Sequence, residues 1–416
     1  MNYIKRHIHD SLEAHLRRKE YTIITGARQV GKTTLLRQFY KELKESKKKV
    51  FYLSLENIDA LSEINKHPEN IFKFTERPLN PLESDEPAHE RMYLLIDEIQ
   101  YANDPSGVLK YLYDTYLSNL KIIATGSSAF YIDRKFKDSL AGRKRIFHLF
   151  PLNFPEYLKF INREDLSNEI STMRTRKDYT SLKNYEIEDH FRNYLVFGGF
   201  PAVALEPDAD LKKEALMELR DSYIKRDILE SDIRNDLEFY KLMTLLAGQI
   251  GNLVNKNELS KTLRIHTNTL DKYMETLEKC FHIKFIKPFY KNLRKEIVKM
   301  PKIYFNDLGL RNVMLQRFSK LETREDTGSM LENYLFLRLS QIHRQEDIKF
   351  WRTADGNEVD FIISADYKTG KAYEVKADGI NYKQTKYKKF TENYPEITLS
   401  IVSYKNHHNS TPILKV

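Results

Sequence analysis

The sequence predicts an α/β protein, with a parallel sheet built around a phosphate-binding loop, then a helical segment, and then a second, smaller α/β region. Three observations support this fold class. A complete GxxxxGK[ST] loop stands between a β-branched run and an amphipathic helix pattern. A later apolar run ends in two adjacent carboxylates. The final segment, 321–416, places several short strand patterns after a helix pattern.

Composition places the chain among globular proteins. Its 416 residues are enough for about three domains. The 26 Tyr and 23 Phe residues exceed what a disordered chain carries. Cys280 is the single cysteine, so no intramolecular disulfide can form, and the first residues lack the apolar core of a signal peptide. No run of about 18 apolar residues occurs, so we expect no membrane span and a soluble, cytoplasmic protein.

The phosphate loop is the most specific motif in the chain. The β-branched run 21–25 leads into GARQVGKTT, and an apolar helix pattern follows. Glycines let backbone N–H groups surround a phosphate at a helix N-terminus. Lys32 can reach the β and γ phosphates, and the Thr33 hydroxyl can bind Mg²⁺. The residues expected to bind ATP are Gly26, Ala27, Arg28, Gln29, Val30, Gly31, Lys32, Thr33 and Thr34.

Two adjacent carboxylates, Asp97 and Glu98, end a later buried strand. An apolar run, 50–55, and an insertion expected to be irregular, 57–91, come before that strand. Neighbouring residues on a strand point to opposite sides, so the two carboxylates can divide the work between them. We expect Asp97 to hold Mg²⁺ and Glu98 to polarise the attacking water.

Two further positions are candidates for contact with the γ-phosphate. The run KIIATGSS predicts a strand that ends in hydroxyls; Ser127 is the favoured sensor of the γ-phosphate, and Thr125 is the alternative. A basic cluster, 142–145, precedes the expected fifth strand. Arg143 in this cluster is predicted to be an arginine finger, because a fixed guanidinium neutralises charge on the transferred phosphoryl group. The position suits action on a neighbouring subunit's nucleotide, but the sequence leaves open whether Arg143 acts within one chain or between two. A solvated basic turn is the alternative.

These motifs resemble those of a large group of predicted prokaryotic ATPases of the AAA type. The matching segments are GARQVGKTT, LLIDEIQ, ATGSSA and LAGRKR. The resemblance implies a P-loop NTPase (AAA+-like) core over 1–155, with the acidic strand not directly beside the phosphate-loop strand. It also implies a helical lid, 156–238, which fits helices interrupted by the turn at 197–201. Arg226 would contact a phosphate from the lid side, or would be an ordinary basic residue on a helix surface.

The excess positive charge is concentrated in one segment. The chain has a formal net charge of +9, and residues 256–302 hold 12 basic and 5 acidic side chains. The pattern over 239–320 predicts a helix, two short helices across a tight turn, and a β-hairpin, which is the order of a winged helix. Phosphate contacts would give salt-dependent DNA binding, although winged helices also dock proteins. The expected DNA contacts are Thr267, Asn268, Lys272, Lys291, Arg294 and Lys295.

The final segment, 321–416, carries a second set of candidate catalytic residues. Glu332 lies on its helix, and the strands that follow carry Asp360, Glu374 and Lys376. Two carboxylates and a lysine at the open side of a sheet can bind Mg²⁺ and activate water for phosphodiester cleavage. The order resembles the restriction-endonuclease-like (PD-(D/E)XK-type) fold, with Asp360 and Glu374 as metal ligands. A structural salt bridge between Glu374 and Lys376 is the alternative.

Together these motifs predict a Mg²⁺-dependent AAA+-type ATPase that couples its nucleotide state to a DNA-contacting winged helix and a nuclease-like domain. The expected cofactors are ATP and Mg²⁺, and the expected partners are DNA and further copies of the chain in a homo-oligomer. A different class of protein is the alternative. It is a slow nucleotide-dependent signalling switch or protein-docking scaffold whose C-terminal domain is catalytically inert.

Overall fold

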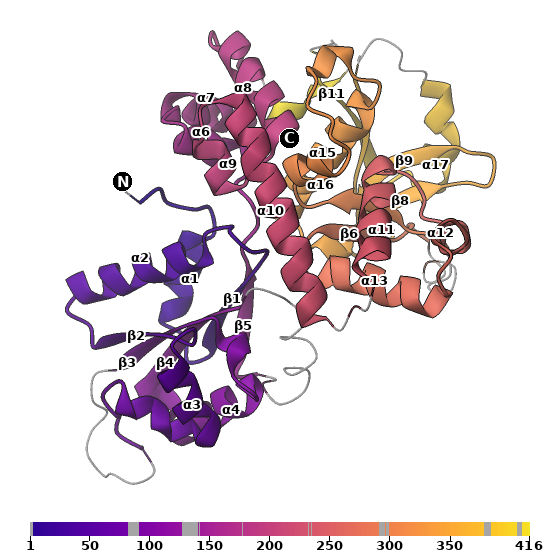
Figure 1. The fold of residues 1–416 in the computed structure, drawn as a ribbon. Helices are drawn as coiled ribbons and strands as arrows, with labels where there is room; N and C mark the ends of the chain where they lie inside the picture. The colour runs from indigo at the N-terminus through magenta and orange to yellow at the C-terminus, as the bar shows by residue number, and fades with distance from the viewer. Residues whose placement is uncertain are drawn as a thin grey trace. The chain divides into compact units, whose positions relative to one another are not determined.

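The protein forms two compact units. The computed structural model describes residues 3–81, 91–126, 140, 142–176, 178–231, 233, 235–290, 296, 299–377, 384–405 and 410–416. The first unit comprises Met1–Phe150 with Lys279–Phe281, and the second comprises Pro151–Glu278 with His282–Val416 (Figure 1). Apart from Lys279–Phe281, the segments expected as lid, winged helix and nuclease-like domain therefore lie in the second unit. None of the helices in the described ranges is long and apolar enough to cross a membrane.

A five-stranded parallel sheet forms the centre of the first unit. Its strands are β1 (Tyr21–Thr25), β2 (Val50–Ser54), β3 (Met92–Asp97), β4 (Leu120–Gly126) and β5 (Lys144–His148). The order is β2-β3-β4-β1-β5, and each neighbouring pair is parallel. β4 thus separates the acidic strand β3 from β1, as the sequence predicts. Because the strands share one direction, the carboxyl ends of β1, β3 and β4 meet at one edge of the sheet.

Helices cover both faces of this sheet. They are α1 (His9–Leu16), α2 (Lys32–Glu45), α3 (Ile58–Lys66) and α4 (Pro105–Tyr116). Figure 1 shows α2 on one face and α3 and α4 on the other. Alternate residues of β3 and β4, such as Leu94 and Ile122, join the core cluster that contains Leu109 and Leu112 of α4. The strands are apolar on both sides because both faces are covered.

The helix α3 contradicts the expectation of an irregular insertion over 57–91. The side chain of Asn57 accepts hydrogen bonds from the N–H groups of Asp59 and Ala60, which caps the helix. Ala60 and Ile64 are four residues apart, so they lie on one helix face, and both are buried. The error came from giving weight to polar residues and prolines when the cap and the short apolar face were both present.

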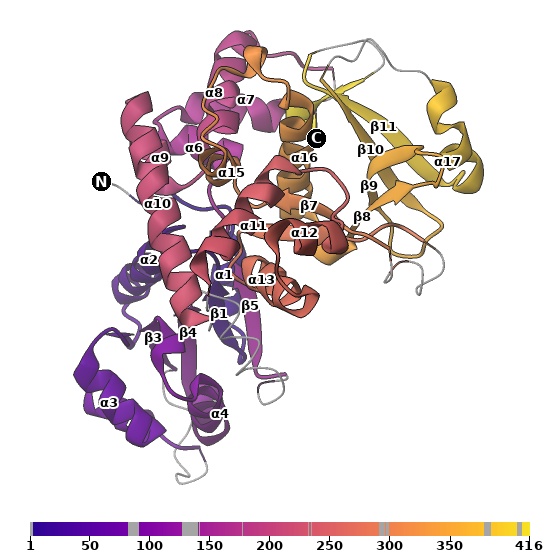
Figure 2. The ribbon, with the colours of Figure 1, turned by 45° about the vertical axis from the view of Figure 1, so that its right-hand side comes forward.

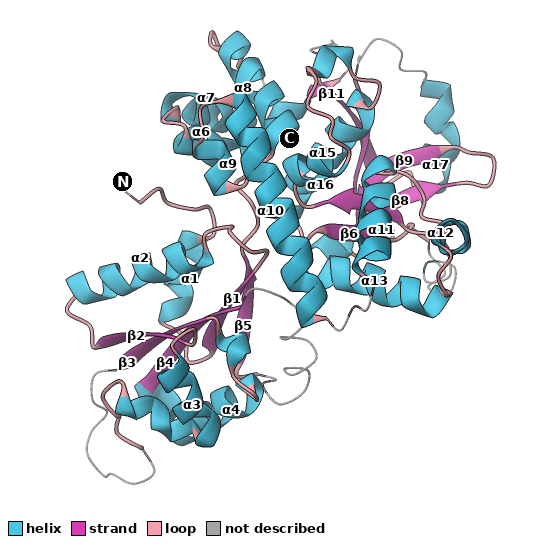
Figure 3. Ribbon diagram, viewed as in Figure 1, coloured by secondary structure: helices cyan, strands magenta, loops and turns pink. Residues whose placement is uncertain are grey.

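The second unit begins with helices alone and continues with a mixture of helices and strands (Figure 3). The first helices are α6 (Phe154–Phe160), α7 (Glu164–Thr175), α8 (Asn184–Phe197), α9 (Pro201–Leu205) and α10 (Ala209–Glu230). Then come α11 (Asp236–Gly248), α12 (Lys256–Leu263), α13 (Thr267–Lys279), β6 (Ile283–Ile286), β7 (Lys302–Phe305) and α15 (Leu308–Met314). β6 and β7 form an antiparallel hairpin, and Leu253 adds an antiparallel bridge to Lys302.

The chain ends in a mixed sheet. Its elements are α16 (Thr327–Ile342), β8 (Ile348–Arg352), β9 (Glu358–Ile363), β10 (Gly370–Lys376), α17 (Lys388–Asn393), β11 (Ile397–Ser403) and β12 (Thr411–Pro412). The strand order is β12-β11-β10-β9-β8, with β10, β11 and β12 parallel and the two pairs made by β9 antiparallel. Figure 2 shows α16 and α17 on either side of these strands.

The segment that leaves β6 pairs with the outer strand of this mixed sheet. The N–H of Phe289 donates to the carbonyl of Phe350 on β8 at 2.5 Å, and the N–H of Phe350 donates to the carbonyl of Lys287 at 3.2 Å. The Phe289 ring is fully buried, stacks on Tyr367 and meets Tyr394 edge to face. The hairpin is therefore anchored to the C-terminal sheet, and the edge of β8 is covered there.

The turn between α8 and α9 is held by α15. Asp307 caps α15 by accepting the Leu310 N–H at 2.8 Å, and its other oxygen accepts the Gly199 N–H at 2.7 Å. Asn312 of α15 donates to the carbonyl of Val196 at 2.8 Å, near the end of α8. Gly198 is thus explained by the close approach of α15, because a Cβ there would lie 2.3 Å from the Asp307 carboxylate.

We predict that Gly199→Ala destabilises the second unit. A Cβ at Gly199 would lie 2.1 Å from the carbonyl oxygen of Leu152, and the N–H of Leu152 donates to Gly199, so neither backbone can yield. Overpacking of this kind costs about 1–3 kcal/mol. The matched control is Gly328→Ala on α16, where the new Cβ meets nothing within 4 Å. Thermal unfolding should show a lower Tm for Gly199→Ala alone; equal shifts in both variants would contradict the prediction.

Candidate functional site

The phosphate loop joins β1 to α2 in the conformation that binding requires. Gly31 has φ 97°, in the left-handed region, and is the residue before α2. A Cβ at Gly26 would lie 2.0 Å from the carbonyl oxygen of Leu149. The two glycines therefore serve different purposes. Gly31 permits the turn into the helix, and Gly26 permits close packing beside β5.

Lys32 lies beneath the loop, with its residue 5% exposed. Its ammonium donates to the carbonyls of Gly26 at 3.0 Å and Ala27 at 2.8 Å. Phosphate oxygens can replace these carbonyls as acceptors without moving the helix. Arg6 braces the same loop, since it donates to the carbonyl of Val30 at 2.8 Å. Sequence reasoning missed Arg6, because no local signal connects it to a loop more than 20 residues away.

Asp97 is surrounded by hydroxyl groups. It is buried at the end of β3 and accepts hydrogen bonds from Thr33 at 3.2 Å, from Tyr52 at 2.8 Å and from Thr125. Burial and, next, the charge of Asp97 raise the pKa of Tyr52 to about 12, so Tyr52 remains a donor at neutral pH. No ion pair to Asp97 is found within the described ranges. The three groups that donate to this carboxylate are all neutral hydroxyl groups.

Glu98 has a strained backbone next to this network. Its φ of 57° and ψ of 51° are left-handed, which is uncommon for a residue other than glycine and often marks a functional position. The Glu98 N–H donates to the Thr125 hydroxyl at 3.0 Å, and the Glu98 carboxylate accepts from Gln100. Thr125, the alternative sensor, thus contacts both acidic residues. Ser127, the favoured sensor, lies outside the described residues.

The donor set at this edge fits a nucleotide-bound Mg²⁺. Mg²⁺ takes oxygen ligands and usually needs only one or two from the protein. The Thr33 hydroxyl and the Asp97 carboxylate lie 3.2 Å apart, at the end of the phosphate loop. The structure therefore brings together the two residues that the sequence predicts for the metal.

Arg143 lies at the amino ends of the strands of the same sheet, opposite the carboxyl ends that carry the phosphate loop and Asp97. Its carbonyl accepts the N–H of Tyr21, the first residue of β1, whereas the phosphate loop follows Thr25 at the other end of β1. Five strand residues span about 16 Å, so Arg143 cannot reach a phosphate on its own loop. Its guanidinium pairs with Asp114 at 2.7 Å. Arg226 is exposed on α10 of the second unit.

A second charged cluster centres on Lys302 of the hairpin. The Lys302 ammonium lies 2.9 Å from Glu332, 2.5 Å from Glu358 and 3.5 Å from Asp360. Tyr304, two residues along β7, also donates to Glu332. The sequence predicts Glu332 and Asp360 for this site but misses Lys302 and Glu358. A signal was present, since Lys302 and Tyr304 form a polar face on an otherwise apolar strand.

Glu374 lies on β10 in the same cluster. It accepts from Lys376 at 2.5 Å and from the Tyr387 hydroxyl at 2.7 Å, and Lys386 is 3.5 Å away. Asp360 accepts the N–H of Val375 at 2.8 Å. The structure therefore places all four predicted residues of this site in one region, with Glu374 and Lys376 in an ion pair. We call Glu332, Glu358, Asp360 and Glu374 the acid cluster.

Burial changes the acid–base behaviour of the acid cluster. Burial and, next, the charge of Asp360 raise the pKa of Glu332 to about 7. The same two causes raise the pKa of Glu374. Burial alone would lower the pKa of Lys302, but Glu332, Asp360 and Glu358 outweigh it and raise that pKa above its usual range. Lys302 is therefore a cation at neutral pH.

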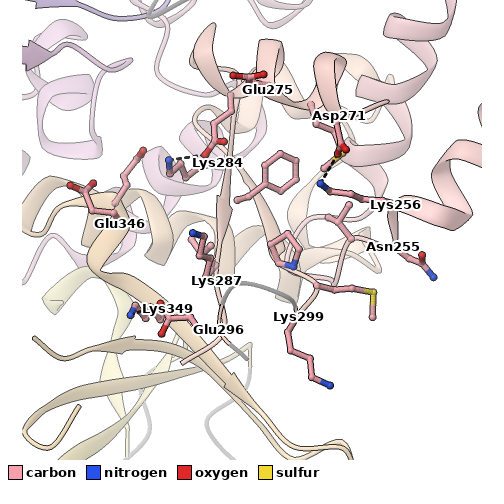
Figure 4. A pocket seen from close by; sticks show the side chains of 18 of the residues that line it. Asn255, Lys256, Asp271, Glu275, Lys284, Lys287, Glu296, Lys299, Glu346 and Lys349 are labelled. Atoms are coloured by element: carbon pink, nitrogen blue, oxygen red, sulfur yellow. Dashed lines mark hydrogen bonds and ion pairs between the residues drawn. The ribbon is translucent and has the colours of Figure 1, made fainter. Parts of the chain in front are cut away.

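The basic segment lines a groove of about 1000 Å³ between α13, β6 and the start of β8 (Figure 4). Acidic side chains pair with three of its lysines, and the pairs are Lys256–Asp271 at 2.5 Å, Lys284–Glu278 at 2.7 Å and Lys349–Glu296 at 2.7 Å. Much of the local positive charge is thus neutralised. Thr267, Asn268 and Lys272 are exposed on α13. The other expected DNA contacts, Lys291, Arg294 and Lys295, lie outside the described residues.

Comparison with known families agrees with the geometry of the first unit. Residues 18–158 match the family model described as an AAA domain. Residues 188–321 match a domain of unknown function (DUF8612), and residues 327–412 match another (DUF4143). The loop, the strand order and the AAA match together show that the first unit carries an AAA-type P-loop domain.

Relatives extend over most of the chain. An uncharacterized protein of Methanocaldococcus jannaschii is 29% identical over 386 residues, which cover 89% of this chain and 77% of that protein. An uncharacterized protein of Haemophilus influenzae is 26% identical over 349 residues, which cover 82% of this chain and 78% of that protein.

Two solved structures are similar to this chain at a low level. Aeropyrum pernix ORC2 in its ADP form has a TM-score of 0.38 and 12% identity, with 77% of this chain and 96% of that chain covered. DnaA from Aquifex aeolicus, bound to AMPPCP, has a TM-score of 0.28 and 14% identity, with 65% and 86% covered.

We predict that Lys32→Ala weakens ATP binding by at least about 100-fold, because charge-assisted hydrogen bonds to two phosphates are lost. Lys32 also donates to the carbonyls of Gly26 and Ala27, so the Tm of the variant is measured as well, and lost affinity is thereby distinguished from lost folding. The matched control is Lys44→Ala, an exposed lysine on the same helix. Titration calorimetry with ATP and Mg²⁺ measures both. Unchanged binding by Lys32→Ala would refute the assignment of the loop.

Proposed function

We propose that the first unit is a Mg²⁺-dependent ATPase and that copies of the chain complete one another's catalytic sites. The observation that supports this proposal best is the network at the end of β3. There Asp97 contacts Thr33 of the phosphate loop, and Thr125 contacts both Asp97 and the Glu98 N–H. A loop for phosphates, a position for a metal and a nearby carboxylate are the parts that phosphoryl transfer to water requires.

In the proposed reaction, the loop N–H groups and Lys32 bind the phosphates. Thr33 and Asp97 hold Mg²⁺, which neutralises charge on the phosphate oxygens. Glu98 accepts a hydrogen bond from the attacking water and orients it toward the γ-phosphate. Thr125 links the two acidic residues, so a change at the metal position would be felt at Glu98.

The arginine finger is proposed to act between copies of the chain. Arg143 lies at the amino edge of the sheet, at the other end of β1 from its own phosphate loop. A guanidinium there can complete a nucleotide site only on a neighbouring molecule. Arg143 would exchange Asp114 for the phosphate when copies assemble. Assembly and hydrolysis are thus coupled in this proposal.

The second unit is proposed to contact DNA through α13. The order of α11, the Leu253 bridge, α12, α13 and the β6–β7 hairpin supports a winged helix. The exposed residues Thr267, Asn268 and Lys272 support contact by α13. The anchoring of Phe289 on the C-terminal sheet limits what the hairpin can contribute.

A mixing experiment tests the ATPase proposal. Glu98→Gln and Arg143→Ala should each reduce turnover at least about 100-fold. In an equal mixture, an Arg143→Ala copy keeps Glu98 and can receive Arg143 from a Glu98→Gln copy. Random assembly should therefore restore about a quarter of the wild-type rate.

The matched control is Arg145→Ala, an exposed arginine on β5 that packs over Phe147 and should keep full activity. A mixture no more active than its separate parts would rule out a finger acting between copies. Negligible turnover by the wild-type protein, with or without DNA, would favour the alternative of a slow nucleotide switch.

The DNA proposal predicts a changed salt dependence. Lys272→Ala should weaken binding to DNA of any sequence and reduce the slope of log affinity against log salt by about 0.9, the value for one lost phosphate contact. Lys213→Ala on α10, whose lysine pairs with Asp210, is the control. Fluorescence anisotropy over a salt series measures the slopes. Identical slopes for Lys272→Ala and wild type would remove α13 from the interface.

A further inference from the structure

Lys302 is a buried cation among carboxylates. Its side chain is 1% exposed, and its ammonium lies within 3.5 Å of Glu332, Glu358 and Asp360. β7 positions it, because the Lys302 backbone pairs with Ile286 and bridges Leu253. An ammonium removed from water is stable only where negative charge surrounds it. The buried ammonium of Lys302 and the carboxylates of the acid cluster therefore stabilise one another.

The charges in and around the acid cluster are already matched. Besides Lys302, Arg352 pairs with Glu358 at 2.9 Å, and Lys376 and Lys386 lie 2.5 and 3.5 Å from Glu374. Four carboxylates thus face four cationic side chains. A divalent ion would bring two further positive charges to a site where, among the described residues, each of the four carboxylates already faces a cationic side chain.

The ligand geometry also disfavours a metal. Among the residues that the structure describes, only His9, Asp10 and Glu13 bring three ligand atoms within 4.8 Å of one another. In the acid cluster, the one buried oxygen left without a hydrogen bond from a described residue is Oε2 of Glu374. The carboxylates of Glu332, Glu358 and Asp360 already accept from Lys302 or from the N–H of Val375, so a metal would have to displace these donors. The residues of the acid cluster do not fit a catalytic Mg²⁺ in this conformation.

We propose that Lys302 is the resident cation of the acid cluster and takes the place that a divalent metal would need. The ammonium closes the site to metal and fastens the hairpin to the C-terminal sheet. Phe289 fastens the other side of the hairpin to β8. This inference concerns the second unit alone and is independent of the ATPase proposal.

Lys302→Met in the full-length protein provides the test. Without nucleotide, the wild-type Tm should not change when Mn²⁺ is added. In metal-free buffer, Lys302→Met should unfold several degrees lower, because its carboxylates lose their central cation. Added Mn²⁺ should restore much of that loss, since a bound ion stabilises the folded state by mass action. A Lys302→Met protein that is stable and indifferent to Mn²⁺ would overturn the proposal.

Three control variants make the result specific. Lys302→Arg keeps the positive charge and should remain indifferent to Mn²⁺. Lys302→Met with Asp360→Asn should lose the response to Mn²⁺. Lys299→Met removes an exposed lysine from the same segment and should behave as wild type.

A direct titration keeps the proposal testable if Lys302→Met does not fold. Free Mn²⁺ measured by electron paramagnetic resonance should fall equally little with wild type and with Asp360→Asn. Stoichiometric binding by wild type that Asp360→Asn abolishes would show that the site takes a metal and would refute the proposal. Mn²⁺-dependent cleavage of circular DNA by wild type, lost in Asp360→Asn, would refute it as well.

Discussion

The shared direction of the five strands in the first unit is the constraint on which its site depends. Because β1, β3 and β4 are parallel, the phosphate loop, Asp97 and Thr125 all follow carboxyl ends at one edge. The same constraint sends the start of β5 to the other edge, where Arg143 lies. The shared strand direction therefore brings the residues of the phosphate-loop site together. It also separates that site from Arg143, whose guanidinium is proposed to complete a nucleotide site. The proposal of a catalytic site divided between molecules rests on this separation.

The local parts of this site could be predicted from the sequence because their chemistry is contiguous. GARQVGKTT contains the glycines, Lys32 and Thr33 in one run, and LLIDEIQ contains both acidic residues. The partners that orient them could not be predicted. Tyr52 reaches Asp97 from the edge strand β2, and Arg6 reaches the loop from before α1. Contacts between residues far apart in the chain leave no periodic pattern, so only the folded structure reveals them.

The same limit applies to the second unit. Predicted strand positions placed Asp360, Glu374 and Lys376 correctly in one region, because alternation on a strand is a local property. That property says nothing about which other element covers the face. In this protein the β6–β7 hairpin covers that face of the C-terminal sheet. Lys302 and Phe289 come from the segment 239–320, which the sequence analysis assigned to a separate winged helix. The failure to predict α3 had a different cause. The cap and the apolar face of this helix are local signals in the sequence, and they were overlooked.

Asp97 and the acid cluster differ in the groups that contact their carboxylates, and that difference distinguishes the chemistry of the two sites. Asp97 is held by Thr33, Tyr52 and Thr125, which are neutral donors, so its charge remains available to a cation that arrives with a nucleotide. In the acid cluster, ammonium and guanidinium groups of the described residues already face the carboxylates. Hydroxyl groups position a carboxylate without neutralising it, whereas a buried lysine does both. The described contacts thus leave Asp97 among neutral hydroxyl donors, which suits the proposed metal, whereas the acid cluster contains its own cation, Lys302, which joins the hairpin to the C-terminal sheet.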